Sequence, residues 1–177
     1  MAHSIELLLD QRADDAVRHT WQSLADAGLP SQLRVSSDTN RPHITLIAAE
    51  RISPDVDEPL AELADRLPLR AVLGAPLIFG TGRMTLARLV VPSAGLLALH
   101  EHIYDVCLQS VTNAFAHSAP PGRWTPHVTL GRRFTPPAQA GDALGLVDGI
   151  TADIRAGIVG GLRRWDSDAR TDRVLIS

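Results

Sequence analysis

A four-residue pattern, His-x-Thr-Leu, occurs twice in this chain of 177 residues, at residues 43–46 and 127–130. A proline precedes each copy. If each copy is a β-strand, alternate side chains point to opposite faces, so the histidine and the threonine share one face. Two such strands brought together would gather a proton acceptor, a proton donor and two hydroxyl hydrogen-bond donors around one point.

This set of groups is suited to cleaving a phosphodiester without a metal ion. In-line displacement at phosphorus places the entering and departing oxygens on opposite sides, so a base and an acid must also stand on opposite sides. Imidazole can serve in either role near neutral pH. We predict that His43 and His127 are the catalytic pair and that Thr45 and Thr129 hold the non-bridging phosphate oxygens, where charge accumulates.

Each of these residues also has an ordinary structural interpretation. A histidine can sit in a strand as a surface or core residue, and threonine favours strands in any case. The repeated pairing of the two residue types favours the functional interpretation for both motifs.

Three residues beside the motifs are predicted to bind substrate. Arg41 and Arg123 precede their histidines by two and four residues, so both are within reach of a phosphate; a solvated arginine is the alternative for each. Trp124 is placed to stack on a base, a common use of aromatic side chains beside single-stranded nucleotides. Packing within the protein is the alternative for this tryptophan.

The composition excludes several mechanisms and gives no sign of a metal site or cofactor. All 17 basic residues are arginine, and the lysine chemistry of Schiff bases, Walker-type phosphate loops and ATP-dependent ligases is therefore absent. On a helix, His100 and His102 would point about 200° apart, which is unsuitable for a shared ligand. The lone Cys107 has no partner for a disulfide or a zinc site and is expected in the core. The remaining histidines lack companions and are expected at the surface: His3, His19 and His117.

The charge balance bears on the kind of partner. A formal charge of −3 and a pI near 6.1 argue against a broad cationic surface for long nucleic acid, so a substrate should be short, terminal or nucleotide-sized. No apolar run approaches the roughly 18 residues of a membrane span, and the first ten residues do not resemble a signal peptide. We expect a cytoplasmic protein with no membrane partner, and a monomer.

The elements that must position the motifs alternate between strands and helices. The order strand, helix, motif strand, helix occurs in each half, which indicates an approximate duplication of architecture. No long linker interrupts it, so residues 1–177 are expected to form a single domain made of two lobes. We predict strands at residues 4–9, 43–48, 69–79, 84–91, 127–132, 150–165 and 173–176, and helices at residues 12–27, 53–67, 93–117 and 137–146.

The paired motifs, in the segments Arg-Pro-His-Ile-Thr-Leu (residues 41–46) and Arg-Trp-Thr-Pro-His-Val-Thr-Leu (residues 123–130), resemble the 2H phosphoesterase superfamily. Within it, the chain is similar to the bacterial RNA 2′,3′-cyclic phosphodiesterases, or 2′-5′ RNA ligase-like proteins. The resemblance implies an α+β, bilobal fold with pseudo-twofold symmetry, in which two antiparallel β-sheets form a central cleft and helices pack outside. It also implies that His43 is the proton donor and His127 the acceptor, although the symmetry makes these roles exchangeable in principle.

The resemblance implies metal-independent hydrolysis of 2′,3′-cyclic phosphates on RNA ends or nucleotides. ATP-independent 2′-5′ ligation is the expected side reaction, when a 5′-hydroxyl replaces water as the nucleophile. ADP-ribose cyclic phosphate and other diesters stay open as substrates. The alternatives are a non-catalytic module of the same fold that binds a nucleotide or phosphoester, and a scaffold protein that retains the fold.

Overall fold

The computed structural model describes residues 2–115, 120–149 and 157–177. Its helices are α1 (Gln11–Asp26), α2 (Asp57–Ala61), α3 (Ala94–Cys107) and α4 (Pro137–Gly149), with shorter 3-10 turns η1 (Gln32–Arg34), η2 (Pro54–Val56) and η3 (Glu62–Arg66). Its strands are β1 (His3–Leu9), β2 (His43–Ile52), β3 (Leu69–Ala71), β4 (Leu73–Phe79), β5 (Met84–Val90), β6 (Val111–Ala114), β7 (His127–Phe134), β8 (Gly157–Asp166) and β9 (Thr171–Ile176).

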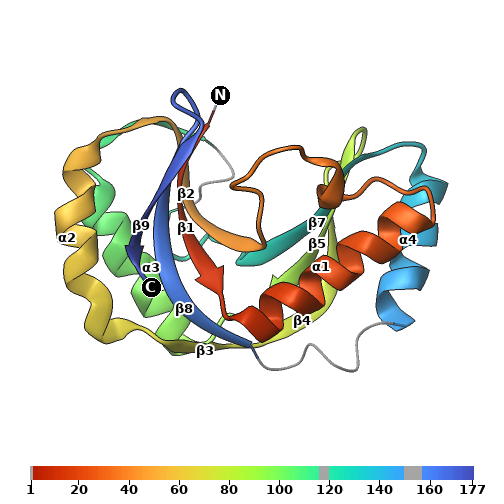
Figure 1. The fold of residues 1–177 in the computed structure, drawn as a ribbon, viewed down its shortest axis with the longest axis horizontal. Helices are drawn as coiled ribbons and strands as arrows, with labels where there is room; N and C mark the ends of the chain where they lie inside the picture. The colour runs from red at the N-terminus through yellow and green to blue at the C-terminus, as the bar shows by residue number, and fades with distance from the viewer. Residues whose placement is uncertain (1, 116–119, 150–156) are drawn as a thin grey trace.

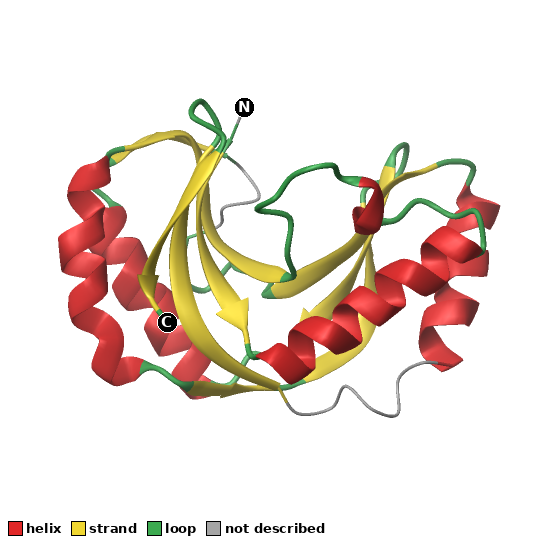
Figure 2. Cartoon of the chain, viewed as in Figure 1, coloured by secondary structure: helices red, strands yellow, loops and turns green. Residues whose placement is uncertain are grey.

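The described strands form one curved antiparallel sheet. Its order is β3-β8-β1-β2-β7-β5-β4, with β6 paired to β2 and β9 paired to β8. Helices α2 and α3 lie beside one half of the sheet, and α1 and α4 lie beside the other (Figure 1 and, by element type, Figure 2). The predicted α+β class, with antiparallel sheets and helices outside them, is confirmed. The two predicted sheets are halves of one, because β2 and β7 pair at Ile44 and Val128.

The two motif strands hold their positions through buried partners on one face. In β2, Ile44 and Leu46 are fully buried, and in β7 Val128 and Leu130 are fully buried. Each motif strand also pairs with a second strand of its own half, β2 with β1 and β7 with β5. The alternation of side chains therefore turns the histidines and threonines to the opposite face.

Gly131 allows the segment between α1 and β2 to approach the second motif closely. A Cβ atom on Gly131 would collide with the backbone carbonyl of Pro30, which begins the segment leading to β2. Only a residue without a side chain fits this contact. The segment between α1 and β2 is thereby packed directly against β7.

The predicted helix over residues 93–117 is wrong in its second half. Helix α3 ends at Cys107, and Val111 to Ala114 form β6, which pairs with the far end of β2. Val111 and Thr112 are β-branched and suit a strand, and β2 offers them an unpaired edge beyond its contact with β7. Residues 116 and 117 of the predicted helix lie outside the described residues.

The other differences are smaller. The predicted helix over residues 53–67 starts as expected, with Ser53 as the N-cap and Pro54 in the first turn, but only its centre is α-helical. The predicted strand over residues 69–79 is divided into β3 and β4. Of the strand predicted over residues 150–165, the part before residue 157 lies outside the described residues.

The predictions about single side chains have different outcomes. His3, expected at the surface, is 4% exposed, and its Nε2 lies 3.1 Å from Asp168 Oδ2. His19 is exposed as predicted, and His117 lies outside the described residues.

Cys107 is buried as predicted, and burial raises the pKa of its thiol to about 12, so it is chemically inert at neutral pH. Among the described residues, no helix has both the length and the apolar character needed to cross a membrane.

A buried ion pair joins α2 to β8. Arg164 donates from Nε to Asp57 Oδ1 at 2.6 Å and from Nη2 to Asp57 Oδ2 at 2.9 Å, and both side chains are buried. The hydrogen bonds that Arg164 donates to Asp57 prevail over burial and raise the pKa of its guanidinium above the ordinary value. The Arg164 guanidinium therefore keeps its charge in the folded state.

Replacing Asp57 with alanine should lower the free energy of unfolding by about 3–5 kcal/mol, because it leaves the Arg164 charge buried without its main partner. Chemical denaturation followed by circular dichroism measures this change. Glu58→Ala, at the exposed neighbouring position of α2, is the matched control and should change stability by about 0.5 kcal/mol or less. Equal losses in the two variants would show that the ion pair contributes nothing specific.

Candidate active site

The four motif residues meet where β2 and β7 pair. Ile44 lies opposite Val128 in antiparallel register. The residues on either side of this pair also face each other, so each histidine lies across from the threonine of the other motif. His43 is opposite Thr129, and His127 is opposite Thr45. Residues directly opposite in such a pair have Cβ atoms about 4.5–5.5 Å apart, and diagonal neighbours are about 7–8 Å apart. The two imidazoles are thus diagonal neighbours on one face of the sheet, with a threonine beside each.

Both imidazole rings are oriented by the same backbone device. The Nδ1 of His43 lies 2.7 Å from the carbonyl oxygen of Arg41, and the Nδ1 of His127 lies 2.8 Å from the carbonyl oxygen of Thr125. A carbonyl oxygen only accepts, so each Nδ1 carries a hydrogen and donates it. Proton exchange with a ligand then falls to Nε2 in both rings.

Two tryptophans support the motif backbones. Trp21 of α1 donates its indole hydrogen to the carbonyl oxygen of Thr129 at 3.0 Å, and Trp124 donates to that of Thr45 at 3.1 Å. These bonds fix the backbone at both threonines. Within the described part of the chain, no residue hydrogen-bonds to either threonine hydroxyl, so both are available to a ligand.

The ring of Trp124 is itself held by a histidine from another element. His100 of α3 stacks on it with centroids 4.0 Å apart and the planes 5° from parallel. His100 is 1% exposed, and burial lowers its pKa despite a hydrogen bond to the backbone of Leu46, so the ring is neutral at physiological pH. These contacts give Trp124 a structural role; stacking of a base on it stays a prediction. His102 is exposed whereas His100 is buried, as expected for two residues at this spacing on a helix.

The two arginines predicted to bind phosphate lie in different surroundings. The Nε of Arg41 is 3.6 Å from Oδ2 of Asp14, a buried carboxylate of α1 that also pairs with Arg18. Arg123 is exposed in the turn before β7. Among the described residues, neither arginine side chain forms a hydrogen bond or ion pair with a motif histidine or threonine, so binding of phosphate by either arginine stays a prediction.

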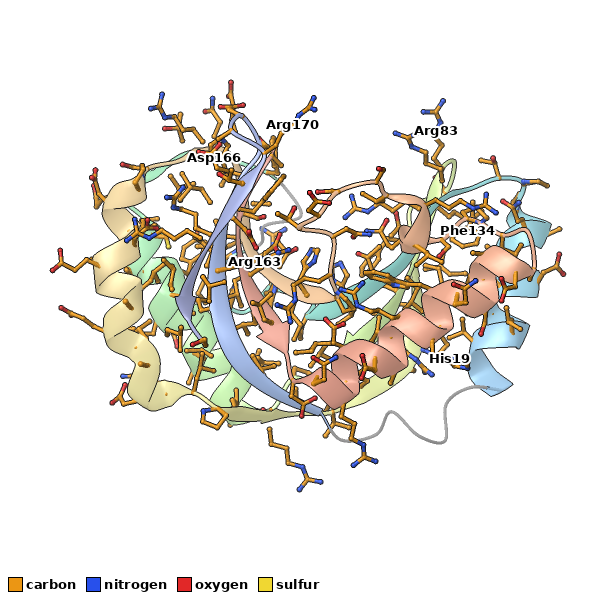
Figure 3. All side chains as sticks on the ribbon, viewed as in Figure 1. His19, Arg83, Phe134, Arg163, Asp166 and Arg170 are labelled. Atoms are coloured by element: carbon orange, nitrogen blue, oxygen red, sulfur yellow. The ribbon has the colours of Figure 1, made fainter. Side chains whose placement is uncertain are left out.

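A buried glutamate that the sequence did not single out lies beside His43. Glu6 of β1 is 4% exposed, and its Oε1 is 3.5 Å from His43 Nε2. Ser4 donates to the same oxygen at 2.6 Å, while Arg163 of β8 donates to Oε2 from Nε at 2.8 Å and lies 2.7 Å from it through Nη2. Figure 3 shows Arg163 near the middle of the molecule. The sequence did contain a signal for Glu6: it is a carboxylate within an otherwise apolar predicted strand. A buried carboxylate must have partners, so its position indicated a specific role.

The surroundings of Glu6 keep it ionised. Burial alone would raise the pKa of the carboxyl group. The charges of His43 and Arg163, with hydrogen bonds from Ser4 and Arg163, outweigh burial and hold that pKa below its ordinary value of 4.5. Glu6 is therefore an anion across the neutral pH range.

His127 has a different neighbour. The ring of Phe79, at the end of β4, lies 4.7 Å from the His127 ring, centroid to centroid, with the planes tilted by 49°. Nothing in the local sequence of Phe79 indicated this contact, which depends on β5 pairing with β4 on one side and with β7 on the other. The two motif histidines thus have a carboxylate beside one ring and an aromatic side chain beside the other.

A possible cation-binding group lies at the other end of β1 and β8. His3, Asp166 and Asp168 are the one set of three potential ligands, among the described residues, whose ligand atoms lie within 4.8 Å of one another. Figure 3 shows Asp166 at the upper end of β8, away from Arg163. Asp168 is largely exposed, and Asp166 Oδ1 accepts hydrogen bonds from the backbone of residues 168 and 169. The motif histidines have no part in this group.

Comparison with known proteins identifies a family and a shared fold. A family model described as the 2′-5′ RNA ligase superfamily matches residues 13–154. Among solved structures, the chain is similar to Escherichia coli LigT complexed with NADP+, with a TM-score of 0.53, 17% identity, and coverage of 99% of this chain and 93% of that one.

It is also similar to Usb1 of Kluyveromyces marxianus with uridine monophosphate, with a TM-score of 0.53, 10% identity, and coverage of 99% and 97%. Another structure of that Usb1 gives a TM-score of 0.50 at 10% identity, with coverage of 99% and 98%. These likenesses establish the shared fold. No curated protein sequence matches the chain. With the family model covering most of its length, the chain belongs to the 2′-5′ RNA ligase superfamily of 2H phosphoesterases, a membership that supports a function of the phosphodiesterase type.

Proposed function

We propose that this protein hydrolyses 2′,3′-cyclic phosphates, on RNA ends or nucleotides, by metal-independent acid and base catalysis. One observation carries the proposal: two imidazoles, each with Nδ1 held by a backbone carbonyl, share a face with two threonine hydroxyls. A module that only bound a phosphoester would not require two titratable rings oriented in the same way.

The proposed reaction assigns one step to each residue. His127 Nε2 takes a proton from water, and the water oxygen bonds to phosphorus. The bond from phosphorus to one ribose oxygen breaks, and His43 Nε2 gives its proton to that oxygen. The hydroxyls of Thr45 and Thr129 donate to the non-bridging oxygens, which carry the developing charge.

Several independent considerations support the proposed substrate class. The superfamily is one of phosphodiesterases and ligases, and two structures of similar fold were determined with uridine monophosphate and with NADP+, both nucleotides. The net charge of −3 favours a short or terminal substrate over long RNA. If a 5′-hydroxyl enters in place of water, the same residues form a 2′-5′ bond as the cyclic phosphate opens, without ATP.

Replacing either motif histidine with alanine should lower kcat/KM for a 2′,3′-cyclic nucleotide by about 10²- to 10⁴-fold, because each removes one positioned proton-transfer group. Thr45→Val and Thr129→Val should cost less, on the order of 3 kcal/mol of transition-state stabilisation at most. Steady-state assays with EDTA present measure these losses, on cyclic nucleotides and on oligonucleotides ending in a cyclic phosphate.

The matched control is His19→Ala, which removes an exposed histidine of α1 and should leave kcat/KM unchanged. Loss of wild-type turnover in EDTA would contradict the metal-independent mechanism. Tight nucleotide binding without turnover would support the binding-module alternative.

The dependence of kcat/KM on pH should be bell-shaped, because one ring must be neutral and the other charged. Protonation of His127 should produce the acidic limb, and loss of the His43 proton the alkaline limb. His127→Ala should therefore retain only the alkaline limb in its residual activity, and His43→Ala only the acidic limb. A profile that is flat between about pH 5 and 9, or one in which the two variants lose the opposite limbs, would contradict the assigned roles.

A further inference from the structure

The register of the sheet aligns polar side chains from four strands beside the motif histidines. Arg163 of β8 pairs with Glu6 of β1, and Glu6 pairs with Thr45 of β2. Thr45 lies across from His127 of β7, one residue from the Ile44–Val128 pair. Directly paired residues point to the same face, so Glu6 shares the face of the motif residues and is a diagonal neighbour of His43.

The contact between Glu6 and His43 involves the nitrogen that has to exchange the proton. The Nδ1 of His43 is held by the carbonyl of Arg41, whereas Nε2 lies 3.5 Å from Glu6 Oε1. The His43 side chain is 21% exposed and the Glu6 side chain 5% exposed, so water screens their attraction only in part. A hydrogen on Nε2 is therefore stabilised by a nearby negative charge.

The carboxylate is fixed in position by Arg163. Besides its bonds to Glu6, Arg163 donates from Nη1 to the carbonyl oxygen of Thr39 at 2.9 Å and to Asp172 Oδ2 at 2.8 Å. These partners come from the segment before β2 and from β9. Arg163 holds Oε2 of Glu6, and Ser4 donates to Oε1, the oxygen that faces His43. Glu6 therefore has little freedom to turn away from His43.

The charges of this cluster favour a positive His43. Glu6 and Asp172 are anionic and Arg163 is cationic, so the three sum to −1 before His43 is counted. A proton on His43 brings the sum to zero. In the described part of the chain, two other charged or titratable groups are close to His43 in sequence or register: Arg41, whose side chain pairs with Asp14 of α1, and the diagonal imidazole of His127.

We propose that Glu6 is a positioning residue that keeps the proton on Nε2 of His43, and so makes His43 the acid of the pair. This inference rests on the proposed hydrolysis and gives a structural reason why His43 acts as the acid. In this assignment Glu6 contacts neither the phosphate nor the attacking water. Its charge acts through His43, and Arg163 holds that charge in place.

Glu6→Gln tests the inference, because the amide keeps the shape of the side chain and removes its charge. The alkaline limb of the kcat/KM profile should move to lower pH by about 1 unit or more, while the acidic limb stays in place. At a pH above the shifted limb, kcat/KM should fall by about 10-fold relative to the wild type, and below it the two proteins should be similar. The midpoint of the His43 imidazole titration, followed by NMR, should shift in the same direction, and that of His127 should not.

Asp57→Asn is the matched control, since it also removes a buried carboxylate that pairs with an arginine of β8, away from His43. It should lower stability without moving either limb. If Glu6→Gln does not fold, Glu6→Asp provides the same test: the carboxylate withdraws by one methylene, and the alkaline limb and the His43 midpoint should shift to lower pH by a smaller amount.

The outcomes separate this inference from the proposed function. If the wild type turns over no cyclic phosphate, hydrolysis is wrong, and the NMR titration of His43 still decides on Glu6. If the wild type is active but neither the alkaline limb nor the His43 midpoint moves in a folded Glu6 variant, Glu6 is only a counter-ion for Arg163 and the inference is overturned.

Discussion

The arrangement of the candidate site depends on the pairing of Ile44 with Val128. This is where the two halves of the sheet join, and both side chains are fully buried on the face opposite to the histidines. A strand has a side-chain period of two, so a slip of one residue at this contact would turn one motif away from the other. The buried aliphatic residues of both motifs oppose such a slip, because it would expose them to water.

Around that contact, each half supplies different surroundings to its histidine. The half with β1 and β8 provides charged groups, Glu6 and Arg163, while the half with β4 provides the ring of Phe79. The backbone contacts are nevertheless alike, with a carbonyl two residues earlier accepting from each Nδ1. A nearly symmetric frame thus holds two imidazoles beside different neighbours, and unlike surroundings are how a pair of like groups can take unlike roles.

Much of this could be predicted from local sequence, and the rest depended on long-range register. The period of two within each motif was enough to place His43 and Thr45 on one face, because alternation is a property of the strand itself. The position of Glu6 beside His43 depends on how β1 aligns with β2, and that register contains a shift between residues 5 and 6 that no local pattern reveals. The β6 segment was assigned to a helix because its apolar residues continue the spacing of α3, whereas the open edge of β2 determines its actual conformation.

The fixed Nδ1 contacts have a consequence for repeated turnover. Hydrolysis by the proposed route leaves His43 without its Nε2 proton and His127 with an additional one, so the site must be reset before it can act again. His43 must gain a proton and His127 must lose one, and the Nδ1 hydrogen of each ring is engaged by a backbone carbonyl. The reset has to proceed through Nε2 and the solvent, for which the partial exposure of His43 leaves a route.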